Sequence, residues 1–195
     1  GRGAPRVGNT IVKNAVRRNL GAAGIVVTTG APSIFGTGNI ISKNKCTSNT
    51  INIAVAGSGT DTLVQKNTAS VSTGSAGILA AAPGCTVRRN TCIGNRVDGI
   101  LIDSDNNAII NNVCNSSVFG SGVLLGFGVE GNSITGNTAN VNGRDGCEAD
   151  ATARYNTISG NTFLDNLNYD MEDHGSPTID NTWNGNTYRT ANFTP

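Results

Sequence analysis

Four ionisable residues late in the chain could carry acid–base or metal chemistry: Glu148, Asp150, Glu172 and His174. Glu148 and Asp150 are two residues apart, and Glu172 and His174 repeat this spacing 24 residues later. Two neighbouring carboxyl groups raise one pKa, so one group can serve as the acid and the other as the base. His174 is the only histidine, and it is the candidate partner for proton transfer. The four residues are therefore the candidate catalytic set.

The same patch permits two other interpretations. Glu148, Asp150 and Glu172 together offer several carboxylate oxygens, which are the ligands that Ca²⁺ prefers. Alternatively, the patch is a solvated polar end of the fold, where water and Arg144 or Arg154 relieve the repulsion between the carboxylates. No other metal or cofactor is predicted.

A second candidate set is basic and lies in the first half of the chain. Lys13, Lys43, Lys66 and Arg89 each stand directly before an asparagine of a regular series. If these positions stack, the four cations Lys13, Lys43, Lys66 and Arg89 could bind an anionic polymer such as a uronic-acid polysaccharide. The alternative is that they are ordinary solvated residues of turns.

The elements that position both sets follow from that asparagine series, whose gaps are 30, 23, 23, 22, 25, 24 and 25 residues. Self-similarity at such a period is typical of solenoids, in which each coil buries its apolar side against its neighbours. An asparagine at each turn would bond to the next coil and form an internal ladder. The series is Asn14, Asn44, Asn67, Asn90, Asn112, Asn137, Asn161 and Asn186.

Apolar residues keep register with the asparagines, three residues before and two residues after each one. A further short segment with period-2 alternation begins eight to ten residues after each of the first seven asparagines. Alternation of this kind indicates strands with one buried face. Glycine often stands at the entry of this segment, where we expect a sharp bend or a positive φ. Register of this kind favours parallel stacking of coils about 4.8 Å apart, which would make Glu148 and Glu172 neighbours.

The outward column of the same segment is unexpectedly apolar before it becomes acidic. It reads Val26, Ala54, Leu79, Leu101 and Leu124. An apolar stripe on a surface is usually covered by a loop or a partner, or binds a ligand. Val26, Leu79, Leu101 and Leu124 are therefore the predicted interface residues if the chain forms a homo-oligomer.

Composition excludes several classes of protein. Only 14% of the 195 residues are charged, against about 25% in an ordinary domain, and the net charge is +1 without any basic run. A nucleic-acid-binding groove and a membrane span are therefore not predicted. Three of the five cysteines, Cys46, Cys92 and Cys114, occupy a repeated apolar position. Each is either a small buried hydrophobe or part of a disulfide between coils.

The repeats VGNTIVKN, TGNIISKN, GNSITGNT and YNTISGNTF resemble those of the right-handed parallel β-helix family with NosD-like and pectate-lyase-like repeats. The resemblance implies an all-β, single-stranded right-handed parallel β-helix of about eight coils with an internal Asn ladder. Residues 1–195 would form one domain that lacks its N-terminal cap. The final string DNTWNGNTY would close the other end with large aromatic residues.

The resemblance also implies an extracellular or cell-surface location and a function connected with polysaccharides. The motifs of its enzymes are absent, and the nearest string is EDHG at residues 172–175. We therefore expect a non-catalytic scaffold or polysaccharide-binding module. The alternatives are a lyase, hydrolase or epimerase acting on an acidic polysaccharide, and an oligomeric fibre or spike segment, so enzymatic activity stays open.

Overall fold

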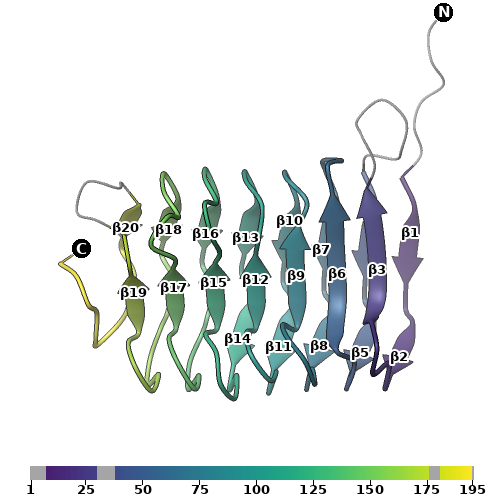
Figure 1. The fold of residues 1–195 in the computed structure, drawn as a ribbon, viewed down its shortest axis with the longest axis horizontal. Coiled ribbons are helices and arrows are strands. Elements are labelled where there is room, and N and C mark those ends of the chain that lie inside the picture. Colours follow the sequence, from purple (N-terminus) through teal and green to yellow (C-terminus); the bar gives the residue numbers. More distant parts are fainter. Residues whose placement is uncertain (1–7, 30–37, 176–180, 195) are drawn as a thin grey trace, which may run out of the picture.

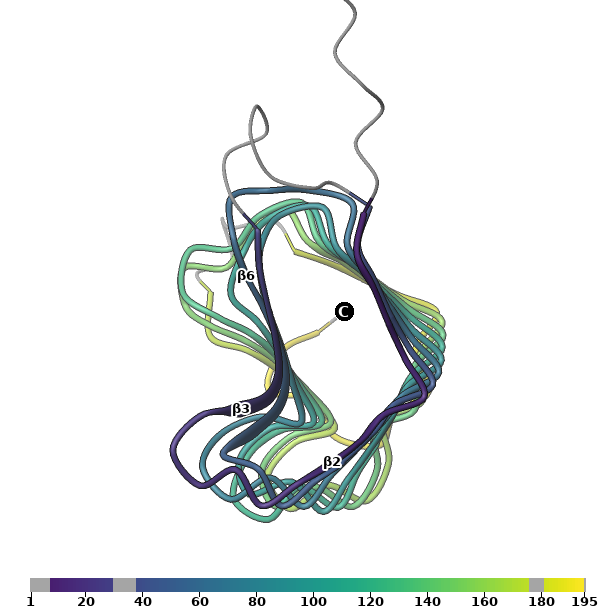
Figure 2. The same cartoon turned by 90° about the vertical axis from the view of Figure 1, so that its right-hand side faces the viewer.

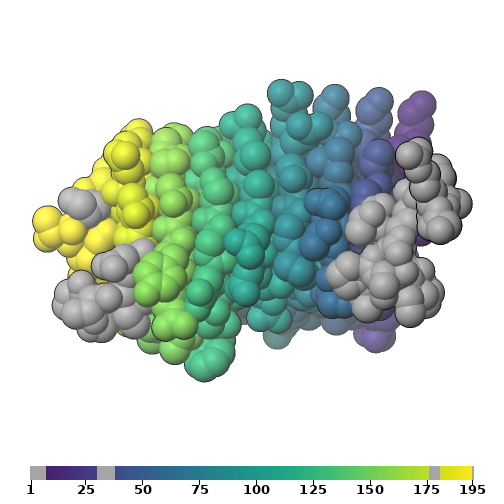
Figure 3. Space-filling view, turned by 90° about the horizontal axis from the view of Figure 1, so that it is seen from above, coloured from purple at the N-terminus to yellow at the C-terminus, as the bar shows by residue number. Residues whose placement is uncertain are grey.

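The fold is a stack of β-coils, as seen in a computed structural model that describes residues 8–29, 38–175 and 181–194. The described residues contain twenty short strands and no helix, and the strands form three parallel sheets. Figure 1 shows the coils side by side along one axis, and Figure 3 shows the same order from above. The predicted all-β solenoid is confirmed.

Each coil contributes one strand to each sheet in turn. The first sheet contains β1 (Thr10–Val12), β4 (Ile40–Ser42), β7 (Leu63–Gln65), β10 (Thr86–Arg88), β13 (Ala108–Ile110), β16 (Ser133–Thr135), β18 (Thr157–Ser159) and β20 (Thr182–Asn184). The second contains β2 (Ala15–Arg17), β5 (Lys45–Thr47), β8 (Thr68–Ser70), β11 (Thr91–Ile93) and β14 (Val113–Asn115). The third contains β3 (Ala23–Thr29), β6 (Ile51–Gly57), β9 (Ile78–Ala81), β12 (Ile100–Ile102), β15 (Val123–Leu125), β17 (Cys147–Ala149) and β19 (Met171–Asp173).

The hand of the coil can be followed in Figure 2, which looks along the stack from its N-terminal end. The chain turns clockwise as it recedes from the viewer, so the β-helix is right-handed. Because the three sheets contain eight, five and seven strands, the number of complete coils differs slightly from the predicted eight.

The predicted register is observed between successive coils. Ile41 pairs with Val64 in the first sheet, and Leu101 pairs with Leu124 in the third. The inward columns are fully buried along most of the stack and form one continuous core. At the C-terminal end, Trp183 packs against Phe193 with ring centroids 5.0 Å apart. The predicted lack of an N-terminal cap concerns residues 1–7, which lie outside the described residues.

The asparagine ladder stabilises the corner between the first and second sheets. The backbone N–H and the side-chain Nδ2 of Asn90 both donate to Oδ1 of Asn112, at 2.9 and 3.0 Å. Nδ2 of Asn90 also donates to the carbonyl of Val64 in the preceding coil, at 2.9 Å. The pattern repeats at every step of the series from Asn14 to Asn186. Buried polar groups are thereby satisfied, which offsets the cost of burying them.

Two further ladders were not predicted, and they lie five residues before and five residues after the predicted one. Cys85 N–H donates to Asn107, and Ser117 N–H donates to Asn142, at 2.7 and 3.0 Å. The preceding ladder continues through Asn132, Asn156 and Asn181, and the following one ends at Asn166. All three corners of the coil are therefore built in the same way.

The entry glycines of the third sheet stand at bends, so the first of the two expected conformations is observed and the second is not. Gly77, Gly99, Gly122 and Gly146 do not have a positive φ. They are required because neighbouring atoms are too close for a side chain, since a Cβ on Gly99 would lie 2.5 Å from the carbonyl oxygen of Gly122. Positive φ is found instead at the residue before most ladder positions, in all three corners.

Candidate functional site

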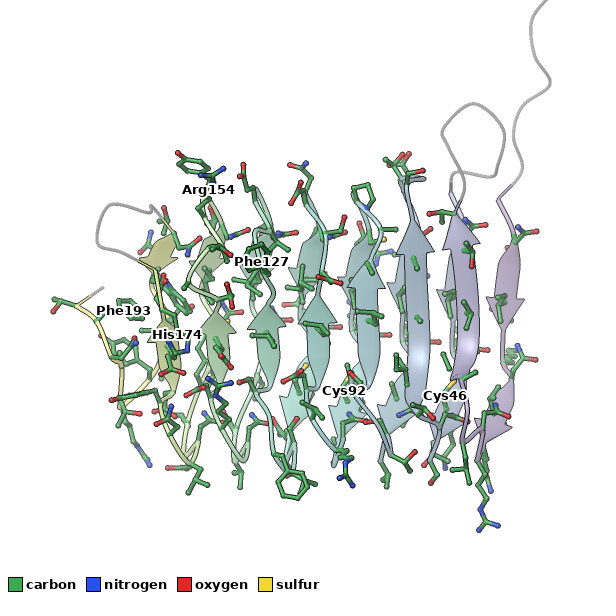
Figure 4. The ribbon with its side chains drawn as sticks, in the orientation of Figure 1. Cys46, Cys92, Phe127, Arg154, His174 and Phe193 are labelled. Carbon is green, nitrogen blue, oxygen red and sulfur yellow. The ribbon has the colours of Figure 1, made fainter. Side chains whose placement is uncertain are left out.

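The third sheet places the candidate acidic residues side by side on its outer face. Glu148 is the central residue of β17 and Glu172 is the central residue of β19, and the two are register partners. His174 follows β19 directly, and its backbone N–H donates to the carbonyl of Ala149. In Figure 4 His174 lies beside the acidic end of this sheet.

Arg144 and His174 cover the two glutamates. Nη2 of Arg144 lies 2.9 Å from Oε1 of Glu148 and 3.8 Å from Oε2 of Glu172. Nε2 of His174 lies 3.1 Å from Oε2 of Glu172 and 3.4 Å from Oε1 of Glu148. Each glutamate is only 5% exposed, whereas the side chains of Arg144 and His174 are partly exposed. A cation from this chain therefore sits where the two carboxylates converge.

Two buried aspartates enlarge the cluster. Asp145 accepts hydrogen bonds from the backbone of Tyr169 and from Asn168, at 2.8 and 3.1 Å. Asp98 accepts one from the backbone of Ser121, at 3.0 Å. The Ser121 hydroxyl in turn donates to Oε2 of Glu148, at 2.8 Å, and so links the two carboxyl groups.

Burial disfavours negative charge on the two aspartates of this cluster. Burial is the main cause that raises the pKa of Asp98 to about 6, and Glu148 adds to the effect against Ser121 N–H and Arg144. Burial, followed by the contact with Glu172, raises the pKa of Asp145 to about 7. Both shifts show that the cluster holds negative charge at a cost.

Two carboxylate oxygens in the cluster have no hydrogen-bond partner. They are Oδ2 of Asp145 and Oε2 of Glu172, and both are buried. Arg144 Nε approaches the first at 3.4 Å and His174 Nε2 the second at 3.1 Å, but neither contact has hydrogen-bond geometry. Buried acceptors without partners favour the proximity of a cation or a shared proton.

Asp150 does not join the other three predicted residues. Its Oδ1 accepts hydrogen bonds from the backbone and the hydroxyl of Thr152, at 3.1 and 2.9 Å, and so closes its own turn. The structure instead brings together one ligand atom each from Glu148, Glu172 and His174, all within 4.8 Å of one another. A set of two carboxylates and one imidazole suits borderline divalent metals better than Ca²⁺, which takes six to eight oxygens.

The apolar outward column leads along the third sheet toward this cluster. Val26 is 52% exposed, whereas Leu79, Leu101 and Leu124 are partly buried. Figure 2 shows loops projecting on both sides of this sheet. The role of this column as the interface of a homo-oligomer stays a prediction.

Two exposed phenylalanines flank β15 within its coil. Phe119 precedes the strand and is 66% exposed, and Phe127 follows it and is 78% exposed. Figure 4 shows Phe127 near the cluster end of the stack. Arg96 lies over the Phe119 ring at 5.6 Å. The sequence analysis missed this pair, because it considered only the low aromatic content of the chain and not the positions of the individual rings.

The predicted basic set lies elsewhere. Lys13, Lys43, Lys66 and Arg89 are exposed at the corner between the first and second sheets. This corner is away from the outer face of the third sheet in Figure 2. The basic and acidic sets therefore lie apart in the fold.

All five cysteines are buried free thiols, so the disulfide alternative is not realised. Cys92 and Cys114 are register partners within the core. Burial raises the pKa of Cys46 to about 11. The pKa of Cys147 also lies well above its usual value because of burial. The cysteines thus behave as small apolar residues, as one of the two alternatives predicted.

Asp98 and Asp145 are the functional candidates that the sequence did not reveal. Both stand directly before the entry residue of a third-sheet strand, in a column that also contains Ala76, Ser121 and Tyr169. Since this column has no uniform residue type, no periodic signal marks it. The clustering of the two aspartates with Glu148 depends on loop packing.

The fold and the site together define a parallel β-helix protein with a buried acidic cluster on one outer face. The chain belongs to the family described as periplasmic copper-binding protein (NosD), which matches residues 5–194. No curated protein matches the chain. Among the described residues, no helix has the length and apolar character needed to cross a membrane.

Two solved structures share the fold at low sequence identity. One is the enzymatically active domain of tailspike protein 2 of bacteriophage CBA120, with a TM-score of 0.72 and 13% identity. The other is the A-module of the mannuronan C-5 epimerase AlgE4 of Azotobacter vinelandii, with a TM-score of 0.68 and 17% identity. The likeness covers 93% and 94% of this chain, but only 33% and 58% of those structures.

Proposed function

We propose that this β-helix is a rigid scaffold for a divalent metal site, with copper(II) as the foremost candidate. The observation that carries the proposal is the convergence of Glu148, Glu172 and His174, whose ligand atoms lie within 4.8 Å of one another. The family description names copper, and the donor set fits it, because imidazole and carboxylate suit Cu²⁺. Oε2 of Glu172 is buried without a hydrogen-bond partner, which adds to the support.

The free-energy cost of burying Glu148 and Glu172 supports a role for them beyond stability. Earlier coils place Leu101 and Leu124 in the column that Glu148 and Glu172 continue. Replacing buried ion pairs by apolar residues is often neutral or stabilising, so a purely structural column could have remained leucine. A cation-binding role explains why carboxylates stand there.

Arg144 would compete with a metal ion for the carboxylates of Glu148 and Glu172. Its guanidinium lies 2.9 Å from Glu148 and 3.4 Å from the His174 ring, so it neutralises the carboxylates in the absence of a metal. Because its side chain is 45% exposed, it can turn toward solvent when a divalent cation binds. The thiols are poor alternatives, since all five are buried, and burial raises the pKa values of Cys46 and Cys85 to about 11.

The experiment is a titration of the protein with Cu²⁺, followed by electron paramagnetic resonance. We expect one bound Cu²⁺ with hyperfine coupling to a single histidine nitrogen. His174→Gln should remove that coupling and weaken Cu²⁺ binding about a hundredfold. Even the loss of a residue that only orients a metal ligand typically lowers metal affinity ten- to a hundredfold, and His174 is itself a proposed ligand. Arg144→Gln should tighten binding, because it removes the competing cation.

Arg154→Gln is the matched control, because Arg154 forms an ion pair with Glu130 away from the cluster. It should leave Cu²⁺ binding unchanged. Binding that survives both His174→Gln and Glu148→Gln would refute the site. Zn²⁺ and Ca²⁺ titrations distinguish a copper site from a general divalent site and from the predicted calcium site.

A polysaccharide-binding function is the second candidate. The exposed Phe119 and Phe127 flank β15, next to the cluster, and exposed aromatic rings with a polar neighbour are suited to stacking on sugars. Both solved neighbours are described as enzymatic domains or modules, and one is an epimerase of mannuronan. The carboxylates of Glu148 and Glu172 at this face favour an uncharged sugar over a uronate, which carries the same sign of charge.

The sugar test compares native protein with Phe127→Ala on a glycan array. Retention of a neutral glycan by the native protein and its loss in the variant would support this candidate, and equal retention would refute it.

The family description and the fold of a phage tailspike domain support a location outside the cytoplasm for either function. A homo-oligomer through the apolar column and a fibre segment remain predictions that solution mass would test.

A further inference from the structure

A row of four cations stands at one corner of the first four coils. Lys13, Lys43, Lys66 and Arg89 are exposed and occupy the same left-handed turn position, with φ of 58°, 57°, 55° and 54°. Backbone hydrogen bonds join this corner from coil to coil, from Lys43 N–H to Gln65 and from Lys66 N–H to Arg88. We call these four residues the basic ridge.

The basic ridge is costly to the fold. A left-handed conformation is strained for residues with a Cβ, and glycine avoids the strain. The last three coils use glycine at this position, namely Gly136, Gly160 and Gly185. Like charges at the same turn of adjacent coils repel one another, which adds a second cost. The fifth coil has the uncharged Asn111 at this position, so the charge repulsion is confined to the first four coils.

A second corner of the coil shows that the turn itself does not require a cation. The corner that follows the second sheet has Arg18, Ser48, Val71 and Gly94 at the equivalent left-handed position of the same coils. Residue type thus varies freely where only the backbone bend matters. Four cations in succession at a single corner indicate a charge requirement.

Nothing in the described residues neutralises the basic ridge. None of its members forms an ion pair within residues 8–29, 38–175 and 181–194. Eleven of the fourteen basic residues precede Asp98 in the sequence, but only one of the thirteen acidic residues, Asp61, does so. Exposed Lys45 and Arg18 add to the positive charge of the same coils. The first half of the rod is therefore strongly basic.

We propose that the basic ridge binds a linear anionic polysaccharide, which lies along the axis of the stack. Cations repeat at the coil spacing of about 4.8 Å in a straight row, which suits a chain with one charge on each repeating unit. Single-stranded nucleic acid is less suited, because its binding sites combine cations with aromatic rings for base stacking. The exposed rings of Phe119, Phe127 and Tyr155 belong to later coils.

The basic ridge is independent of the metal site, because it uses another corner and none of the same residues. Its test measures binding of alginate to native protein and to the triple variant Lys43→Gly, Lys66→Gly, Arg89→Gly at low salt. We expect affinity to fall about tenfold, because three exposed ionic contacts of modest strength are lost. The melting temperature should stay equal or rise, because glycine relieves the strained φ.

Asn111→Gly is the matched control, since Asn111 holds the same left-handed position without a charge. It should leave alginate affinity unchanged. Adding cations through Gly136→Lys and Gly160→Lys should lengthen the basic ridge and tighten binding. Three outcomes overturn the proposal: unchanged affinity in the triple variant, a loss of affinity that only accompanies a lower melting temperature, or tighter binding of poly(dT) than of alginate.

Discussion

Replacement of Asp98 by asparagine should stabilise the protein at neutral pH and leave it unchanged in acid. Asp98 is buried, and burial raises the pKa of its carboxyl group from 3.8 to about 6. The folded protein therefore holds the Asp98 proton more tightly than the unfolded chain does. By linkage, its contribution to stability is complete below about pH 4 and is lost as the pH rises to about 6.

The magnitude follows from the size of the shift. A shift of one pKa unit corresponds to about 1.4 kcal/mol, so two units give an upper value of about 3 kcal/mol. Asparagine cannot ionise, but its Oδ1 can still accept the hydrogen bond that Asp98 receives from the backbone N–H of Ser121. We therefore expect Asp98→Asn to gain about 2 kcal/mol in free energy of unfolding at pH 8, and close to nothing at pH 4.

The assay is urea unfolding followed by far-ultraviolet circular dichroism at pH 4, 5, 6 and 8, with EDTA present. Asp165→Asn is the control, because the side chain of Asp165 is 56% exposed and pairs with Arg189 at the surface. Its effect should be small at every pH. Glu148→Gln should lower the pKa of Asp98 and so narrow the pH range over which Asp98 changes the stability of the protein. An equal gain at pH 4 and pH 8, or no gain at pH 8, would refute the reasoning.

Three other predictions concern the ladder, the acidic column and the thiols. Asn112→Ala should cost about 2–4 kcal/mol of unfolding free energy, because it strips Asn90 of the acceptor for two buried donors; chemical denaturation measures the loss, and a cost below 1 kcal/mol would contradict the ladder's role. Glu148→Leu with Glu172→Leu should preserve or raise the melting temperature while abolishing Cu²⁺ binding; calorimetry on the same sample checks both, and a large fall in melting temperature would show that the glutamates are structural. Cys46 should resist thiol reagents in the folded protein near pH 8, since burial raises its pKa to about 11; rapid labelling without denaturant would be the opposite result.

Much of the fold could be predicted because one residue type recurs at one corner. Asn112 and its counterparts fix the coil length, and the apolar positions around them fix the register that pairs Glu148 with Glu172. The two additional ladders have the same period, but other residues interrupt their asparagine series. Thr62 and Cys85, for example, stand in place of asparagine in one of them. Serine replaces asparagine at Ser72 and Ser117 in the other ladder.

The candidate site was less predictable, because side-chain direction decides it. The sequence placed Asp150 beside Glu148, but the hydroxyl of Thr152 two residues later offered the carboxylate a closer partner. Asp98 and Asp145 lie before strands whose neighbouring loops fold over them, and no period in the sequence encodes that packing. The glycines before the same strands were identified correctly, but the close approach of the next coil explains them better than a positive φ.

The most direct test of the central claim is a crystal structure of the copper-loaded protein, with anomalous scattering measured at the copper absorption edge. The proposed function predicts one strong peak between the carboxylates of Glu148 and Glu172 and the His174 ring, with the Arg144 side chain turned toward solvent. A peak at the buried cysteines, or no peak near His174, would contradict it.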